Sequence, residues 1–238
     1  MGVRALSVWL APIRPTTAST AGALRVIQAR TPRFVPWCLG VSGTYPHIPG
    51  SPFARVNAGL RQAIRDDEVQ FASDPTVKRR VRCRYAALYA TAIDRRLLSA
   101  STVVVSALLP ATKLLPLSNG AQQWAAVTVR VPSGQRIRIA DLFADPTDGL
   151  TTVAHAWTRS FKRAYPRSWW PCVTAFPEAY RPTTRNYRYF ALTTKGLAIG
   201  FPNIAACGRF HATVSYSVLR PYLSRLGAEL VVGVRASR

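Results

Sequence analysis

The last third of the chain constrains the fold more than any other part. Two apolar segments, residues 187–192 and 197–201, flank the polar connection 193–196 (TTKG). Gly196 can supply the positive-φ position that a tight connection needs, so this pattern predicts a β-hairpin. Apolar and polar residues then alternate over 210–216, which is typical of a half-buried strand. The segment therefore predicts antiparallel β-structure.

A short helix is predicted after this strand, over residues 217–226. Ser217 can cap its N-terminus, Pro221 falls near the first turn, where proline is tolerated, and Gly227 is expected to end it. Its apolar residues recur on one face: Leu219, Tyr222, Leu223 and Leu226.

Two further helices are predicted upstream. Ser51 and Pro52 are typical of a helix start, and apolar residues follow them at helical spacing: Phe53, Val56, Leu60, Ile64 and Phe71. A second helix is expected to begin at Asp141 or Asp148. Its apolar residues recur at every fourth position: Val153, Trp157, Phe161 and Tyr165.

Strand-like segments lie between these helices. Residues 77–92 and 97–109 predict one hairpin, and residues 124–131 and 136–139, around a Pro-Ser-Gly turn, predict another. Runs of strands with helices before, between and after them favour α+β over a parallel βαβ sheet. The predicted fold is therefore α+β, with antiparallel hairpins, a packed N-terminal helix, a middle helix and a short C-terminal helix. Residues 37–238 are expected to form one domain, and residues 1–36 a leader or tail.

The order of these elements resembles the lysozyme-binding extracytoplasmic domain of the anti-sigma factor RsiV. This family is also found beside polysaccharide deacetylases and in a mycobacterial secreted immunogenic protein. The resemblance rests on the hairpin at 195–197 (KGL), the pair 207–208 (CG) and the strand-to-helix join 214–219 (VSYSVL). Residues 45–48 (YPHI) and 140–143 (ADLF) resemble the family's opening and its central junction. The resemblance implies an exported recognition domain.

The cysteines point to the same compartment. Cys38, Cys83, Cys172 and Cys207 are widely separated, with no Cys-x-x-Cys and no histidine spaced to complete a zinc site. Four cysteines permit three pairings. We favour Cys38–Cys83 and Cys172–Cys207 because each pair joins segments that bracket one half of the domain. Four free thiols in a cytosolic protein are the alternative.

The start of the chain and its hydropathy also bear on location. Arg4 precedes a short apolar run over residues 5–11, which resembles a truncated signal core. An uncharged apolar run, over residues 97–112, is shorter than the ~20 residues that a spanning helix needs. The protein is therefore expected to be secreted or to reside in the cell envelope.

The charge is strongly unbalanced. The formal net charge is +22, from 32 basic and 10 acidic residues, so the chain should attract anionic partners. Basic and apolar residues alternate in two strand-like segments, which would turn their guanidinium groups to one face. The candidate anion-binding residues on these two segments are Arg80, Arg82, Arg84, Arg136 and Arg138.

Aromatic residues cluster in a proline-rich loop over residues 165–172. Trp169 and Trp170 could stack on sugar rings or at a lipid interface, since aromatic rings provide a large contact area. Covering an edge of the core is the commoner role for such residues.

Motifs for catalysis are missing from the sequence. It contains no Gly-x-Ser-x-Gly, no His-Glu-x-x-His, no Walker loop and no dinucleotide fingerprint. His47, His155 and His211 are far apart and are interpreted as structural or surface residues. Asp141 is predicted to cap a helix rather than to act as a general acid. We therefore expect no catalytic residue, no metal and no cofactor, and the protein is not expected to be an enzyme.

The expected function is non-catalytic binding in the cell envelope by a monomer. The expected partner is an acidic lipid, a phosphorylated glycan or an acidic protein. Lysozyme is disfavoured because common lysozymes are themselves strongly basic, and because residues 110–120 depart from the family's loop sequence. One alternative is an intracellular nucleic-acid-binding protein. Only the net charge supports this alternative, so nucleic acid is not the expected partner. The other is an accessory domain of an envelope glycan hydrolase or deacetylase.

Overall fold

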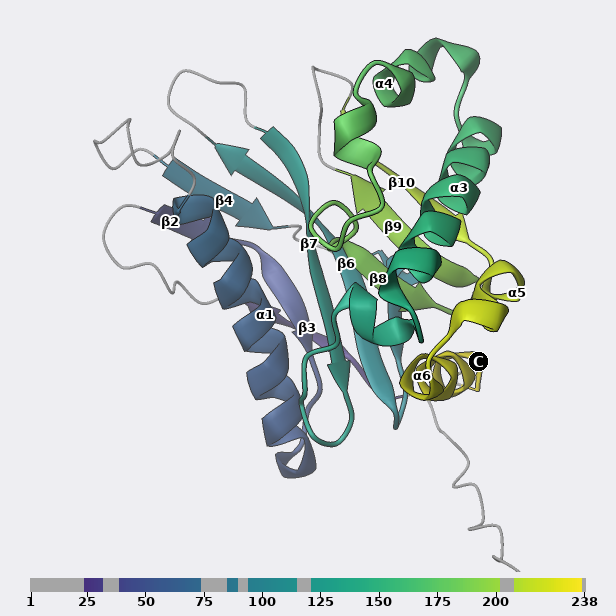
Figure 1. The fold of residues 1–238 in the computed structure, drawn as a ribbon. Coiled ribbons are helices and arrows are strands. Elements are labelled where there is room, and N and C mark those ends of the chain that lie inside the picture. Colours follow the sequence, from purple (N-terminus) through teal and green to yellow (C-terminus); the bar gives the residue numbers. More distant parts are fainter. Residues whose placement is uncertain are drawn as a thin grey trace, which may run out of the picture.

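The computed structural model describes residues 24–31, 39–73, 85–89, 94–114, 121–201 and 208–236. Figure 1 shows a central sheet with α1 along one side and, on the other, a smaller sheet with α3, α5 and α6. The strands are β1 (Ile27–Arg30), β2 (Leu39–Ser42), β3 (Thr44–His47), β4 (Tyr85–Tyr89), β5 (Leu98–Ala100), β6 (Val104–Leu114), β7 (Ala121–Arg130), β8 (Phe190–Thr193), β9 (Gly196–Phe201) and β10 (Phe210–Val214). The α-helices are α1 (Ala54–Ala72), α3 (Pro146–Ala164), α4 (Pro171–Thr174), α5 (Tyr216–Leu219) and α6 (Arg225–Arg235). The 3₁₀ turns are η1 (Ser51–Phe53), η2 (Arg95–Leu97), η3 (Ile139–Leu142), η4 (Arg167–Trp169), η5 (Pro177–Tyr180) and η6 (Arg220–Tyr222).

Two sheets carry most of this fold. In the larger sheet the strand order is β2-β4-β6-β5, and β7 also pairs with β6. These pairings are antiparallel, except that β2 and β4 run parallel. The smaller sheet is an antiparallel meander of β8, β9 and β10, and β1 pairs with β3. The mixture of hairpins and separate helices confirms the predicted α+β class.

Strand β6 is buried on both faces. One alternating set of its side chains shares a core cluster with α1: Val105, Ala107, Leu109 and Ala111. On the opposite face Leu108 packs with Trp124 and with β8 and β9 residues. The Oγ of Ser106 on this second face accepts a hydrogen bond from the Leu192 N–H at 2.8 Å. Because side chains alternate along a strand, β6 holds the smaller sheet on the face opposite α1.

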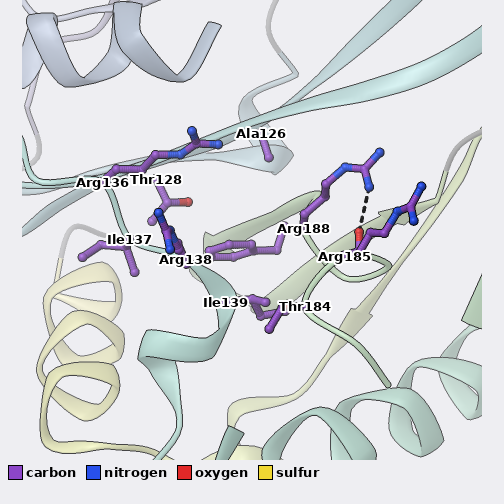
Figure 2. Close-up of a pocket in the computed structure, with 10 residues that line it drawn as sticks. Ala126, Thr128, Arg136, Ile137, Arg138, Ile139, Thr184, Arg185 and Arg188 are labelled. Carbon is purple, nitrogen blue, oxygen red and sulfur yellow. Dashed lines mark hydrogen bonds between the residues drawn. The ribbon is translucent and has the colours of Figure 1, made fainter. Parts of the chain in front are cut away.

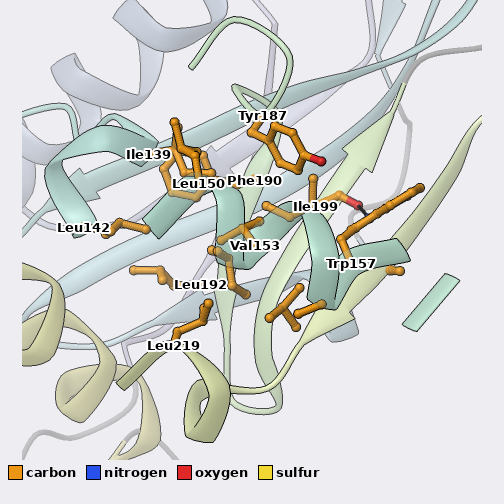
Figure 3. Packing of buried hydrophobic residues seen from close by; sticks show 14 of the residues in the cluster. Ile139, Leu142, Leu150, Val153, Trp157, Tyr187, Phe190, Leu192, Ile199 and Leu219 are labelled. Carbon is orange, nitrogen blue, oxygen red and sulfur yellow. Dashed lines mark hydrogen bonds between the residues drawn. The ribbon is translucent and has the colours of Figure 1, made fainter. Parts of the chain in front are cut away.

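The helical spacing predicted for the middle helix is confirmed. Val153, Trp157 and Phe161 of α3 are fully buried, and Tyr165 is half-buried. Figure 3 shows Val153 and Trp157 facing the core residues of β8 and β9. The indole Nε1–H of Trp157 donates to the Ile199 carbonyl at 3.1 Å, so this bulky ring is both packed and hydrogen-bonded.

The two long helices begin at slightly different residues from those predicted. α1 is preceded by η1, and Ser51 makes no side-chain capping bond. α3 begins at Pro146 rather than at Asp141 or Asp148. The reason is that the Asp145 carboxylate caps it, accepting hydrogen bonds from the N–H groups of Thr147 and Asp148.

The predicted C-terminal helix over 217–226 is wrong in its boundaries. Ser215, not Ser217, caps α5, and Ser224 caps α6, which continues to Arg235. Gly227 therefore lies inside α6 and does not end a helix. A Cβ at this position would collide with the Leu142 backbone, so the glycine allows α6 to pack closely against η3.

The hairpin of β8 and β9 is confirmed, with Gly196 at a φ of 152°. The strand predicted over 136–139 is wrong, because only a single bridge joins Arg136 to Val129 before η3 begins. Within 77–92 the described strand is β4, and the strand predicted over 97–109 divides into β5 and β6.

The start of the domain includes residues from the segment expected to be a leader or tail. Strand β1 lies within residues 1–36 and pairs with β3, which lies outside this segment. None of the helices in the described part of the chain is long and apolar enough to cross a membrane.

Replacing Trp157 by alanine should lower the free energy of unfolding by about 3–5 kcal/mol, because it leaves a cavity and removes an indole from the core. Urea unfolding followed by circular dichroism measures this change. Arg159→Ala, on the exposed side of the same helix, is the control and should stay within about 0.5 kcal/mol. Equal effects of the two substitutions would contradict the packing described here.

Candidate anion-binding site

One side of the candidate site is the segment that joins β7 to η3. Ile137 and Ile139 are each only 2% exposed. Their burial turns the alternating residues Arg136 and Arg138 toward solvent. The predicted alternation of basic and apolar residues is therefore confirmed, although the segment is not a strand. Asp141 accepts a hydrogen bond from the Arg138 N–H at 2.7 Å, so it caps the 3₁₀ turn η3, whereas Asp145 caps α3.

The other side is the segment that leads into β8. Tyr187 and Tyr189 are buried, and the half-buried Arg188 lies between them in sequence. The Tyr187 hydroxyl donates to the Tyr180 carbonyl at 3.1 Å. These anchors fix the backbone next to Arg185, whose side chain is exposed.

The two segments enclose a pocket of about 270 Å³. Figure 2 shows Arg136 and Arg138 on one side of this pocket and Arg185 and Arg188 on the other. We call the pocket that these four residues line the arginine pocket. The remaining lining residues are mostly apolar or hydroxyl-bearing: Ala126, Thr128, Ile137, Ile139, Thr184 and Phe190.

The four guanidinium groups differ in their partners. Arg136 forms an ion pair with Asp66 of α1. Among the described residues, no ion pair joins Arg138, Arg185 or Arg188 to a carboxylate. Three positive charges of the arginine pocket therefore lack a described counter-ion.

Arg188 is the most constrained of the four. Its Nη1 donates to the Arg185 carbonyl at 2.9 Å, and its Nη2 donates to the Tyr189 hydroxyl at 2.8 Å. Its guanidinium also lies over the Tyr189 ring, 4.5 Å from the centroid. Its Nε is buried and has no hydrogen-bond partner among the described residues. A buried donor without an acceptor is costly, so this position of Arg188 is maintained at the expense of stability.

The arginine pocket opens into further hollows along α1. Arg188 lines the pocket and two neighbouring hollows, which also involve Gln70 and Tyr189. We call these three adjoining hollows together the Arg188 groove. Burial, and to a smaller extent the Asp67 carboxylate, raises the pKa of the Tyr189 phenol, while Arg188 opposes the shift. The phenol therefore keeps its proton at neutral pH.

A buried ion pair supports one wall of the Arg188 groove. Lys113 Nζ lies 2.9 Å from Asp67 Oδ1, and the two side chains are only 3% and 8% exposed. Lys113 Nζ also lies 5.2 Å from the centre of the Phe71 ring. Asp66 and Asp67 are thus both paired with basic residues, which reduces their repulsion of an anion.

Several residues predicted for the site lie outside the described part of the chain. These are Arg80, Arg82, Arg84, Cys38, Cys83 and Cys207. Cys172, at the start of α4, is half-buried and disulfide-bonded. Its partner lies outside the described residues, so the pairings Cys38–Cys83 and Cys172–Cys207 stay predictions.

Trp169 and Trp170 lie at an edge of the core, away from the arginine pocket. The Trp169 ring is 5.8 Å from Tyr165 and 6.5 Å from Phe210, yet the residue is 38% exposed. Trp170 is half-buried, and Lys162 lies over its ring. The contacts fit the core-covering interpretation, and ligand stacking by these residues stays a prediction.

The histidines do not form a cluster with other ligating residues. His155 is exposed on α3, and His47 and His211 are half-buried. Burial lowers the pKa of His211, whose ring packs edge-on against Trp124. Within the described ranges, no group of three or more His, Cys, Asp or Glu residues could hold a metal ion.

The sequence analysis did not identify Arg185 and Arg188. A signal was present in the alternation of tyrosine and arginine over residues 187–189, directly before the hairpin. Three alternating residues are too few to establish a period, so the sequence alone does not predict a site here. The approach of Asp66 and Gln70 to the same surface depends on how α1 packs on the sheet.

Lys113→Met should lower the free energy of unfolding by about 3–5 kcal/mol, because it leaves the buried Asp67 carboxylate without this cation. The double variant Lys113→Met/Asp67→Leu should recover most of the loss, since apolar replacement of a buried ion pair is often nearly neutral. Urea unfolding measures both changes. Arg181→Ala, which removes an exposed ion pair with Glu178, should cost less than about 1 kcal/mol. A double variant as unstable as Lys113→Met would contradict the assignment of Lys113 and Asp67 as a buried ion pair.

Comparison with known proteins gives a fold but no activity. No protein-family model matches the chain, and no curated protein matches it in sequence. The structure resembles that of a DUF3298 family member from Bacteroides fragilis, with a TM-score of 0.53, 14% identity, and coverage of 91% of this chain and 99% of that one. It also resembles a DUF3298 family protein from Pseudomonas aeruginosa, with a TM-score of 0.54, 11% identity, and coverage of 87% and 98%. The chain therefore has the fold of these two bacterial proteins.

Proposed function

We propose that this protein is a non-catalytic binding domain that recognises an anionic component of the cell envelope through the arginine pocket. The observation that carries the proposal is the convergence of Arg138, Arg185 and Arg188 on one pocket without a described carboxylate partner.

The chemistry of arginine fits this role. A guanidinium presents several N–H donors in a planar fork that matches the oxygens of a carboxylate or phosphate. The pocket is concave and partly apolar, with Ile139 and Phe190 among its lining residues. Attraction between charges is stronger there than on an open surface in water.

The proposal assigns binding rather than catalysis to this site. The carboxylates nearest to it, Asp66 and Asp67, are paired with Arg136 and Lys113. A glycan hydrolase or deacetylase would need a free carboxylate pair, a nucleophile with a base, or a metal cluster. The described surroundings of the arginine pocket supply positive charge and hydrogen-bond donors instead.

The envelope setting is part of the proposal and rests on separate grounds. They are the sequence resemblance to the RsiV-like family and the four-cysteine pattern, together with the disulfide at Cys172. The DUF3298 fold is found in bacterial proteins, which is compatible with this setting. The net charge of +22 argues against a basic partner such as lysozyme.

Arg138→Gln/Arg185→Gln should weaken the binding of inorganic phosphate at least tenfold, because each charge-assisted hydrogen bond contributes about 1.5–3 kcal/mol. Titration followed by NMR at low salt measures this dissociation constant. Raising the salt concentration to about 0.3 M should weaken binding to the unmodified protein, since salt screens exposed charges.

The matched control is Arg159→Gln/Arg163→Gln, which removes the same charge from exposed positions on α3. It should change phosphate binding less than about twofold. Equal losses in the two double variants would mean that net charge, rather than the arginine pocket, attracts the anion, and the proposal would then fail.

A further inference from the structure

We infer that the ligand of the arginine pocket is an anionic saccharide, with its charged group among the arginines and a neighbouring sugar in the rest of the Arg188 groove. This inference rests on the proposed function and makes it more specific. It follows from the shape of the groove, from the change in chemistry along it, and from the location of the exposed apolar side chains.

The shape of the groove accommodates a ligand longer than a single anion. The arginine pocket, of about 270 Å³, adjoins a narrow hollow of about 40 Å³ and a wider one of about 320 Å³. Arg188 lines all three, and Arg185 lines both of the larger hollows. A group held by these two arginines would therefore have open space on either side of it.

The chemistry changes along the groove. The arginine pocket offers guanidinium groups, and the wide hollow shares Arg185 and Arg188 with it but adds the carboxamides of Gln70 and Gln123 and the hydroxyl of Ser73. A carboxamide both donates and accepts hydrogen bonds, as a sugar hydroxyl does. No described hydrogen bond engages the side chain of Gln70 or Gln123, so both can bind a ligand without breaking an existing contact.

The wide hollow also has buried aromatic surface. Phe71 and Tyr189 line it and are 7% and 5% exposed. Their rings adjoin the polar side chains, so the hollow combines an apolar surface with hydrogen-bonding groups. A sugar ring has this combination, with C–H groups on its faces and hydroxyls at its edge.

The apolar residues of the surface argue against an acidic lipid. An acyl chain requires exposed apolar side chains next to the site that holds the headgroup. Among the described residues, none of the large exposed apolar side chains lines the Arg188 groove. They are Ile27, Val69, Trp169, Phe176, Val218, Tyr222 and Val232. A water-soluble ligand is therefore favoured.

Calorimetric titration of the full chain tests the inference with five probes at one ionic strength: inorganic phosphate, trehalose, trehalose 6-phosphate, a disaccharide ending in glucuronate, and vesicles containing phosphatidylglycerol. At least one of the two charged disaccharides should bind about tenfold more tightly than inorganic phosphate, as expected from one or two additional hydrogen bonds. The probe that shows this gain identifies the charged group as phosphate or carboxylate. Uncharged trehalose should not bind measurably.

Gln70→Ala/Gln123→Ala should remove this tenfold gain and leave the binding of inorganic phosphate unchanged. Gln122→Ala/Gln135→Ala is the matched control, because both carboxamides are exposed and neither lines the groove. It should leave the binding of every probe unchanged.

The possible failures are distinguishable. If the charged disaccharides bind no better than inorganic phosphate, or if the Gln70/Gln123 variant keeps the gain, the saccharide inference is wrong and the proposed function stands. If vesicles bind best and the arginine variant abolishes that binding, the ligand is a lipid headgroup and the inference is again overturned. If no anionic probe binds the unmodified protein, the proposed function itself fails.

Discussion

The arrangement of this protein depends on the burial of β6 on both faces. α1 covers one face, and the meander of β8, β9 and β10 covers the other. The hydroxyl of Ser106 is one polar link on the second face, because it bonds both to the Thr128 hydroxyl and to the Leu192 N–H, and Trp124 Nε1 forms another by donating to the Phe201 and Phe210 carbonyls. A buried polar group without such partners would destabilise the fold. These links fix the smaller sheet on the larger one, and with it the segment that enters β8.

The position of that segment creates the arginine pocket. Buried side chains anchor the backbone on both sides, with Ile137 and Ile139 on one and Tyr187 and Phe190 on the other. Because the apolar residues occupy the interior, the intervening arginines share the space between the two segments (Figure 2). The fold therefore brings like charges together, and it does so without a described carboxylate for three of them. Such crowding of like charges is unfavourable, and a bound anion would relieve it.

Sequence patterns predicted the parts of this structure that are regular and local. Apolar residues recur at every fourth position around Trp157, and basic and apolar residues alternate around Arg138. Both patterns are periodic, so both could be predicted from the sequence. Gly227 was misinterpreted because glycine commonly ends a helix, whereas here it allows close packing against a carbonyl of a distant segment. Arg185 and Arg188 lie in an irregular segment, and their approach to Arg138 is a tertiary contact between residues that no short sequence pattern connects.

Total charge and local charge contribute differently to the anion binding that we propose. The net charge of the chain is +22. An exposed basic residue attracts anions weakly and without selectivity, because water and salt screen its charge. Arg159 on α3 is of this kind, since it is exposed and lines none of the described pockets. Arg188 differs because Tyr189 and the Arg185 carbonyl fix its guanidinium before a ligand arrives. Such preorganisation lowers the entropic cost of binding, so under the proposed function we expect selectivity for one anion over another to arise in the Arg188 groove rather than from the charge of the whole chain.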